Sequence, residues 1–183
     1  MRIILGSKSP RRKEILTNAG YKFEVVVSDV DENVSEEDIK KRVKLIAKKK
    51  GEAIFQFYQD DLVISADTIV IINDIALGKP RNKKEAYDMI KLLQGKMHQV
   101  YTAVWVKTKN KEVDFLTSTK VFITKMTDEE IDAYINTTEP YDKAGGYAIQ
   151  GIFAKYIDSI DGDYYNVMGL PICKLNQVLK EFI

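Results

Sequence analysis

The chain has 183 residues, of which 45% are hydrophobic and 30% are charged, a composition typical of a single folded domain with a sizeable core. Lys and Arg number 28 against 27 Asp and Glu, so the chain has no global positive field and its charge argues against broad nucleic-acid binding. No apolar run approaches the roughly 20 residues of a membrane span, so we expect no membrane association.

Two features of the sequence predict a cytoplasmic protein. The lone cysteine, Cys173, excludes an internal disulfide and suits a reducing compartment. Because Cys173 lies in an apolar C-terminal stretch, we expect a packed thiol and not a nucleophile. The N-terminus lacks the apolar core of a signal peptide, since charge returns at Lys8. We therefore expect one cytoplasmic domain over residues 1–183.

The first 20 residues, MRIILGSKSPRRKEILTNAG, predict a short strand followed by a helix. Ser9 suits the N-cap, Pro10 suits the first helical position, and Gly20 can end the helix in a left-handed cap. Arg11 and Arg12 lie in the first turn, where the helix dipole disfavours cations by about 0.3–1 kcal/mol. Either two solvated arginines tolerate this cost, or an anion such as phosphate completes the helix end.

The other elements follow from hydrophobic periodicity and from turn and cap residues. Strands are expected at 2–5, 21–27, 62–72, 98–108 and 113–124, the last two as a hairpin, and short strands follow a glycine-rich loop at 136–151. Helices are expected at 10–19, 36–58, 83–94 and 127–136 and from about 171, with caps at Ser35 and Asp38, at Asn82, and at Thr127 and Glu130. This mixture predicts an α/β protein with a mixed sheet in two lobes around a cleft.

Asp67 is the most unusual residue of the predicted strand LVISADTIVII, whose other polar side chains are Ser65 and Thr68. Burying a carboxylate there costs several kcal/mol unless it is paired or metal-bound. One explanation is an Asp at a kink that backbone N–H groups satisfy. The other is a carboxylate held at a strand end, where it could bind Mg²⁺ or take a proton from water.

Two motifs and an acidic loop supply further candidate site residues. GKP places Lys79 between a glycine and a proline, although by itself the motif favours a surface turn. DKAGGYAIQG contains Gln150, whose amide offers a donor and an acceptor and can read the edge of a nucleobase. The acidic loop could supply a metal ligand, although most of its carboxylates are expected to face water: Asp29, Asp31, Glu32, Glu36 and Glu37.

Two other features have ordinary structural explanations. His98 is the only histidine, which rules out a multi-histidine zinc site and a triad built on another His, and we interpret it as structural. Four lysines cluster in the helix expected at 36–58, and the usual interpretation is a solvated face: Lys44, Lys48, Lys49 and Lys50.

Taken together and in order, these segments resemble the Maf family of nucleoside triphosphate pyrophosphatases. The matching motifs cover nearly the whole chain: GSKSPRRKEIL, then SADTIV, GKP and LLQGKMHQVYTAV, then YDKAGGYAIQG and GDYYNVMGLP. The resemblance implies hydrolysis of a nucleoside triphosphate to the monophosphate and pyrophosphate with a divalent cation, Mg²⁺ or Mn²⁺. It implies a cleft between two lobes of an elongated mixed sheet with flanking helices, and a link to septum formation and cell-division arrest.

The resemblance also assigns roles to individual residues. The Asp of the ADT element is the family's proposed general base, here Asp67, and members acting on dTTP and UTP resemble this chain at Arg11, Thr68 and Gln150. Relatives acting on 7-methyl-GTP differ at all three. The expected phosphate ligands are Ser7, Arg11, Arg12, Lys50 and Lys79, and the expected metal ligands are Asp67 and Glu32. The departures are small: Gly51 stands where alanine is common, and Ile152-Phe153 replaces a smaller pair.

Our first interpretation is therefore an enzyme that acts on dTTP or UTP, with Asp67 as a base or as a metal ligand. One alternative is a non-catalytic nucleotide sensor that regulates division, which would keep the phosphate site without needing Asp67. Another is a pyrophosphatase for modified purine triphosphates. The expected partner is a nucleoside triphosphate, with no nucleic acid and no membrane, and a homodimer is left open.

Overall fold

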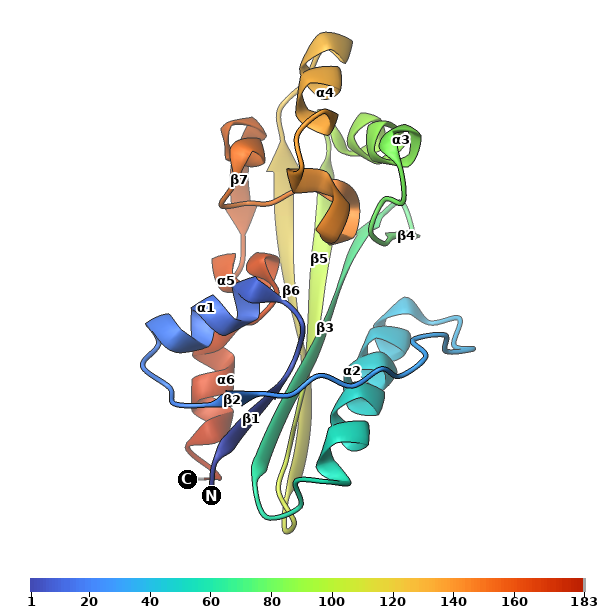
Figure 1. The fold of residues 1–183 in the computed structure, drawn as a ribbon. Helices are drawn as coiled ribbons and strands as arrows, with labels where there is room; N and C mark the ends of the chain where they lie inside the picture. The colour runs from blue at the N-terminus through green and yellow to red at the C-terminus, as the bar shows by residue number, and fades with distance from the viewer. Residues whose placement is uncertain (183) are drawn as a thin grey trace. The chain divides into compact units, whose positions relative to one another are not determined.

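The computed structural model describes residues 1–182 and has the predicted α/β architecture (Figure 1). Within these residues, seven strands form one sheet in the order β2-β1-β3-β5-β6-β7, with β4 paired to β3. The sheet is mixed, because β1 runs parallel to β2 and β3 whereas the β3–β4 and β6–β7 pairs are antiparallel. The strands are β1 (Ile3–Gly6), β2 (Glu24–Val25), β3 (Leu62–Ile72), β4 (Ile75–Leu77), β5 (Met97–Lys107), β6 (Glu112–Ile123) and β7 (Ile157–Asp161).

The helices begin and end largely where cap residues predict. Asn82 caps α3 by accepting from the Glu85 N–H at 2.9 Å, and Thr127 with Glu130 forms the predicted capping box of α4. Gly20 adopts a φ of 80°, as its left-handed role at the end of α1 requires. The helices are α1 (Pro10–Asn18), α2 (Ile39–Phe55), α3 (Lys83–Leu93), α4 (Asp128–Ile135), α5 (Tyr164–Met168) and α6 (Ile172–Leu179).

Two element predictions are wrong. The strand expected at 21–27 shrinks to the two residues of β2, both of them exposed. The capping box expected from Ser35 does not form, because α2 begins later and Asp38 itself is the N-cap, accepting from the N–H groups of Lys40 and Lys41. The short helix α5 was not predicted at all.

The prediction that the Cys173 thiol is packed in the core is also wrong. Cys173 is exposed, because α6 buries its opposite side through Leu175, Val178 and Leu179. The apolar character of the stretch therefore reflects one buried face of an amphipathic helix and does not place every residue inside.

Backbone contacts divide the chain into two compact units. The first contains Met1–Thr68, Thr102–Thr117 and the residues from Gly169 onward, and the second contains Ile69–Tyr101 and Ser118–Met168. Strands β3, β5 and β6 each contribute residues to both units. The single domain over residues 1–183 and the cleft between two lobes stay predictions.

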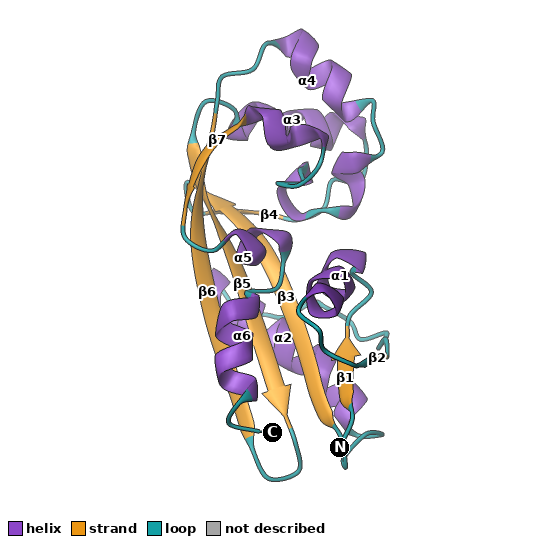
Figure 2. Cartoon of the chain, turned by 90° about the vertical axis from the view of Figure 1, so that its left-hand side faces the viewer, coloured by secondary structure: helices purple, strands orange, loops and turns teal. Residues whose placement is uncertain are grey.

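In the first unit, helices α2 and α6 lie on opposite faces of the sheet (Figures 1 and 2). Gly51 of α2 packs directly on Trp105 of β5, because a Cβ at Gly51 would lie 2.1 Å from the indole ring and 2.5 Å from Ser65 Oγ. The Ser65 hydroxyl in turn donates to the Ala47 carbonyl of α2 at 2.6 Å. This close approach sets α2 against β3 and so fixes the backbone of Lys50, the residue before Gly51.

The second unit has its own core, in which α3 packs against α4 and against the glycine-rich loop. That loop carries two short 3₁₀ helices, η1 (Glu139–Asp142) and η2 (Ala144–Gly146), and a third, η3 (Ile152–Tyr156), follows it directly. In the part of the chain that the structure describes, no helix has both the length and the apolar character needed to cross a membrane.

Candidate functional site

The candidate site of the first unit begins where β1 ends. The pairing of β1 with β3 stops at Gly6 opposite Ser65, and β3 continues beyond it through Asp67 and Thr68. Asp67 therefore lies inside β3 and not at a strand end, which corrects the sequence-based placement. The carboxyl end of a parallel strand is nevertheless where open α/β sheets bind ligands, and Ser7 follows directly from it.

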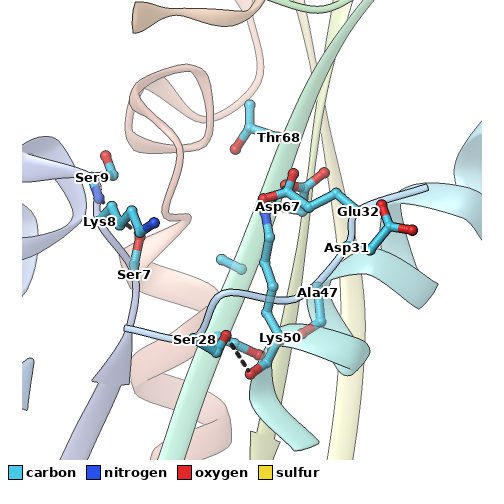
Figure 3. A network of polar contacts seen from close by, with 12 residues as sticks. Ser7, Lys8, Ser9, Ser28, Asp31, Glu32, Ala47, Lys50, Asp67 and Thr68 are labelled. Carbon is cyan, nitrogen blue, oxygen red and sulfur yellow. Dashed lines mark hydrogen bonds and ion pairs between the residues drawn. The ribbon is translucent and has the colours of Figure 1, made fainter. Parts of the chain in front are cut away.

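Lys50 joins Asp67 to the acidic loop. Its Nζ lies 2.8 Å from Asp67 Oδ1 and 3.0 Å from Glu32 Oε1. The side chains of Lys50 and Asp67 are 17% and 18% exposed, whereas Glu32 is 59% exposed. Figure 3 shows Lys50 extending from α2 to reach both carboxyl groups, while its backbone carbonyl accepts from the Ser28 hydroxyl at 3.3 Å. The ammonium group thus compensates a carboxylate charge that burial would otherwise penalise.

Two carboxylates at one point fit a divalent cation. Asp67 Oδ1 and Glu32 Oε1 both lie within 3.0 Å of a single nitrogen, and Mg²⁺ is typically held by one or two carboxylates together with substrate phosphates. Among residues 1–182, no group of three His, Cys, Asp or Glu side chains could hold a metal alone. These carboxylates are donors that Mg²⁺ or Mn²⁺ accepts, provided that phosphate oxygens complete the coordination and that the Lys50 ammonium, which bridges them in this structure, moves aside.

Three of the other carboxylates of the acidic loop have local partners, and Glu37 is exposed. Asp29 pairs with Lys8 at 2.8 Å, and Asp31 accepts from the Asn33 N–H at 2.9 Å. Glu36 accepts from the N–H of the α2 cap residue at 3.0 Å. Glu32 is thus the member of the loop that shares Lys50 with Asp67.

Arg12 uses its guanidinium to join three distant segments. Its Nε donates to the Gly169 carbonyl at 2.7 Å, and its Nη1 donates to the Ala66 carbonyl at 2.9 Å and to Ser7 Oγ at 3.1 Å. Its Nη2 donates to Thr68 Oγ1 at 3.0 Å. The acceptors belong to the loop before α1, to β3 on either side of Asp67, and to the segment before α6.

These contacts change the explanation of a cation in the first turn of α1. Burial lowers the pKa of the Arg12 guanidinium, with Arg11 adding repulsion, while Asp67 and Glu32 oppose the shift. Ser9 is the N-cap residue of α1 as predicted, although its side chain makes no capping bond. The fold itself therefore supplies acceptors for Arg12, and phosphate binding by this residue stays a prediction.

The predicted specificity residues are divided between the two units. In the first, the Thr68 hydroxyl lies 2.9 Å from that of Thr102, and Arg11 is half-buried beside Arg12. In the second, Gln150 is exposed, as is the predicted phosphate ligand Lys79. There the Gly145 N–H donates to the Gly78 carbonyl at 3.0 Å, which joins GKP to the glycine-rich loop.

Sequence reasoning missed two residues of this network. Thr102 is fully buried in β5, and the only available signal was a threonine within an apolar strand. Gly169 adopts a φ of 111°, and its carbonyl accepts from Arg12. It lies in the GDYYNVMGLP motif, but a glycine motif does not indicate which side chain its backbone meets.

His98 lies in the core of the second unit. It is 1% exposed, and its Nε2 lies 2.6 Å from the Tyr147 hydroxyl. Within the described residues, its Nδ1 has no hydrogen-bond partner. Burial lowers the pKa of His98 to about 4, so the imidazole is neutral at neutral pH.

Comparisons with known proteins give a consistent result. A family model described as "Maf-like protein" matches residues 2–182. The chain is 49% identical over 183 residues to a "dTTP/UTP pyrophosphatase" of Thermoanaerobacter sp. (strain X514), covering 98% of this chain and 96% of that protein. It is 48% identical over 185 residues to one of Bacillus anthracis (strain CDC 684 / NRRL 3495), covering 99% and 95%.

A solved structure agrees on the fold. The Staphylococcus aureus Ham1 protein superposes over the full length of both chains with a TM-score of 0.52. The two sequences are 12% identical, so this likeness concerns the architecture alone.

Proposed function

Since the chain belongs to the family of Maf-like proteins, we propose that it is a nucleoside triphosphate pyrophosphatase that hydrolyses dTTP and UTP to the monophosphate and pyrophosphate. The names of relatives that match 98–99% of the chain support this reaction. The observation that carries the proposal is the largely buried Asp67 carboxylate, paired with Lys50 and sharing it with Glu32.

In the proposed reaction, Asp67 takes a proton from a water molecule that attacks the α-phosphorus. A new P–O bond forms to the water oxygen as the bond to the bridging oxygen of the pyrophosphate breaks. Such a reaction depends on positioning and charge stabilisation more than on covalent chemistry. Lys50 supplies positive charge beside Asp67. We propose that it contacts the phosphates together with Ser7, Arg11, Arg12 and Lys79.

A divalent cation belongs to this proposal. Asp67 and Glu32 would hold it with oxygens of the triphosphate, and when bound it neutralises charge on the phosphates. Glu32 is more exposed than Asp67 and so can turn toward a ligand at little cost. If Asp67 serves mainly as a metal ligand, another group must accept the proton of the attacking water.

We propose that Arg11, Thr68 and Gln150 determine which nucleotide the protein prefers. Uracil and thymine present carbonyl acceptors and one N–H donor, which the amide of Gln150 and the hydroxyl of Thr68 can satisfy. A site built to hydrogen-bond such an edge rejects a base that leaves its polar groups unpaired. We therefore propose a preference for dTTP and UTP over ATP and GTP.

A triphosphate panel tests the proposal. Phosphate release is measured with added inorganic pyrophosphatase, with and without Mg²⁺ or Mn²⁺, for UTP, dTTP, ATP, GTP and ITP as a modified purine. We expect kcat/KM for UTP and dTTP to exceed that for ATP and GTP by at least about tenfold. Equal values for UTP and ATP would refute the preference, a maximum on ITP would favour a modified purine, and no release from any would favour a nucleotide sensor.

The setting of this activity is part of the proposal. The single cysteine supports a reducing, cytoplasmic environment, and the balanced charge supports a small-molecule partner over nucleic acid. A role in septum formation rests on the family resemblance and stays a prediction.

A further inference from the structure

The carboxylate of Glu139 grips the backbone that immediately follows Gln150. Its Oε2 accepts from the N–H of Ile152 at 2.7 Å, and its Oε1 accepts from the N–H of Phe153 at 3.1 Å. All four residues belong to the second unit. A charged acceptor on successive backbone donors makes stronger bonds than a neutral one, so the turn at 150–153 is held from outside its own sequence.

Gly151 makes this grip sterically feasible. A Cβ at Gly151 would lie 2.0 Å from Glu139 Oε2, which no real contact tolerates. Its φ of −105° is one that any residue can adopt, so the backbone conformation does not require glycine. Because Gly151 has no side chain, the Glu139 carboxylate can reach the N–H groups of Ile152 and Phe153.

Further contacts hold both the carboxylate and the backbone of Glu139. The hydroxyl of Tyr134, a residue 2% exposed, lies 3.1 Å from Glu139 Oε1 and 3.1 Å from the Gly146 carbonyl. The Lys143 ammonium donates to the backbone carbonyl of Glu139 at 2.8 Å. The carboxylate therefore links the buried face of α4 to both ends of the glycine-rich loop.

Gln150 itself is exposed. A solvated glutamine has several rotamers, so the direction of its amide depends on how firmly its backbone is held. A recognition group is effective when neighbouring residues lock its geometry. On the C-terminal side of Gln150, the Gly151 N–H reaches the Ala148 carbonyl at 3.4 Å, and Glu139 adds the two side-chain contacts to Ile152 and Phe153.

We propose that Glu139 is a positioning residue for substrate choice, which holds the turn at 150–153 so that the Gln150 amide can meet the edge of the base. This inference rests on the proposed function. Glu139 acts through Gln150 and takes no part in proton transfer or phosphate binding.

Glu139→Gln tests the proposal, because an amide keeps the shape but can replace only one of the two accepting oxygens. Hydrogen exchange of the Ile152 and Phe153 amides should accelerate by at least about tenfold. The KM for UTP should rise by about tenfold while kcat stays within about threefold, and kcat/KM for ATP should not change. The matched control is Glu130→Gln, which also removes a carboxylate from the second unit. It should leave α4 intact, because glutamine can replace glutamate in a capping box.

Gly151→Ala is the second variant, in case Glu139→Gln folds poorly. It leaves Glu139 intact but forces the carboxylate away, so the same acceleration of exchange and the same loss of preference are expected. Unchanged exchange of the Ile152 and Phe153 amides in a folded variant would show that Glu139 does not hold the turn at 150–153. Faster exchange with an unchanged ratio of UTP to ATP activity would overturn the positioning role.

Gln150→Ala separates this inference from the function on which it rests. If Gln150→Ala lowers the preference for UTP and Glu139→Gln does not, the positioning role is wrong and the assignment of Gln150 stands. If Gln150→Ala leaves the preference intact, the base-reading role fails, and the positioning role fails with it. If the parent protein releases no pyrophosphate from UTP or dTTP, the proposed function itself fails.

Discussion

Arg12→Met should destabilise the protein in the absence of any ligand. The substitution keeps a side chain of similar length and removes the donors to the carbonyls of Ala66 and Gly169 and to the hydroxyls of Ser7 and Thr68. From its position in the first turn alone, Arg12 would be expected to affect anion binding and hardly the fold. The four contacts reverse that expectation.

The size of the stability loss in Arg12→Met depends on which of the four acceptors keep another hydrogen-bond partner. Thr68 Oγ1 retains the Thr102 hydroxyl at 2.9 Å, and Ser7 Oγ retains the Ser9 N–H at 3.2 Å. The two carbonyls lose a charged donor, at about 1.5–3 kcal/mol each, and relief of the half-buried charge offsets part of this. We expect the free energy of unfolding to fall by about 2–4 kcal/mol, which lowers the Tm by about 5–15 °C for a chain of this size.

Urea denaturation of the ligand-free protein, followed by the fluorescence of the buried Trp105, measures this change. The matched control is Arg81→Met, because Arg81 is 85% exposed and pairs with Glu85 on the surface, where loss of an ion pair is expected to leave the urea midpoint essentially unchanged. Arg12→Lys keeps a charge without the planar fork and should fall between the parent and Arg12→Met.

An unchanged urea midpoint in Arg12→Met, together with a large rise in the KM for UTP, would refute this reasoning. It would mean that the four contacts contribute no net stability and that the guanidinium acts only on phosphate. A loss of stability shared equally by Arg81→Met would also contradict it, since the effect would not depend on the buried contacts.

Asp67→Asn keeps the shape of the side chain and should lower kcat for UTP by about 10²–10⁴-fold; a rate within about threefold of the parent would exclude Asp67 as the general base. Gly51→Ala would drive a methyl group into the Trp105 ring, 2.1 Å from the added carbon, and should cost about 1–3 kcal/mol in urea denaturation. An unchanged midpoint would mean that α2 shifts freely. Burial lowers the pKa of His98 to about 4, so protonation of the unfolded chain should remove up to about 3 kcal/mol of stability between pH 6.5 and 4. His98→Gln should flatten this dependence, and parallel curves for parent and variant between pH 6.5 and 5 would contradict it.

Features that depend on neighbouring residues in the chain could be predicted from the sequence. The bounds of β3, the Asn82 cap of α3 and the capping box of Thr127 with Glu130 are all confirmed. Each rests on a side chain that meets the backbone within three residues or on a continuous apolar run. The same local logic identified Asp67, because a carboxylate within an apolar strand needs a partner wherever the strand lies.

The tertiary structure decided which partners those residues have. The Gly169 carbonyl that accepts from Arg12 is 157 positions away in the sequence, and Lys50 reaches Asp67 across 17. No sequence pattern predicts a role for Glu139, since a glutamate before a proline in a polar loop gives no signal of its own. Its contacts exist because the chain returns to it at Ile152 and Phe153. Local patterns specify where a charged or polar group must be satisfied, whereas only the packing of distant segments specifies which group satisfies it.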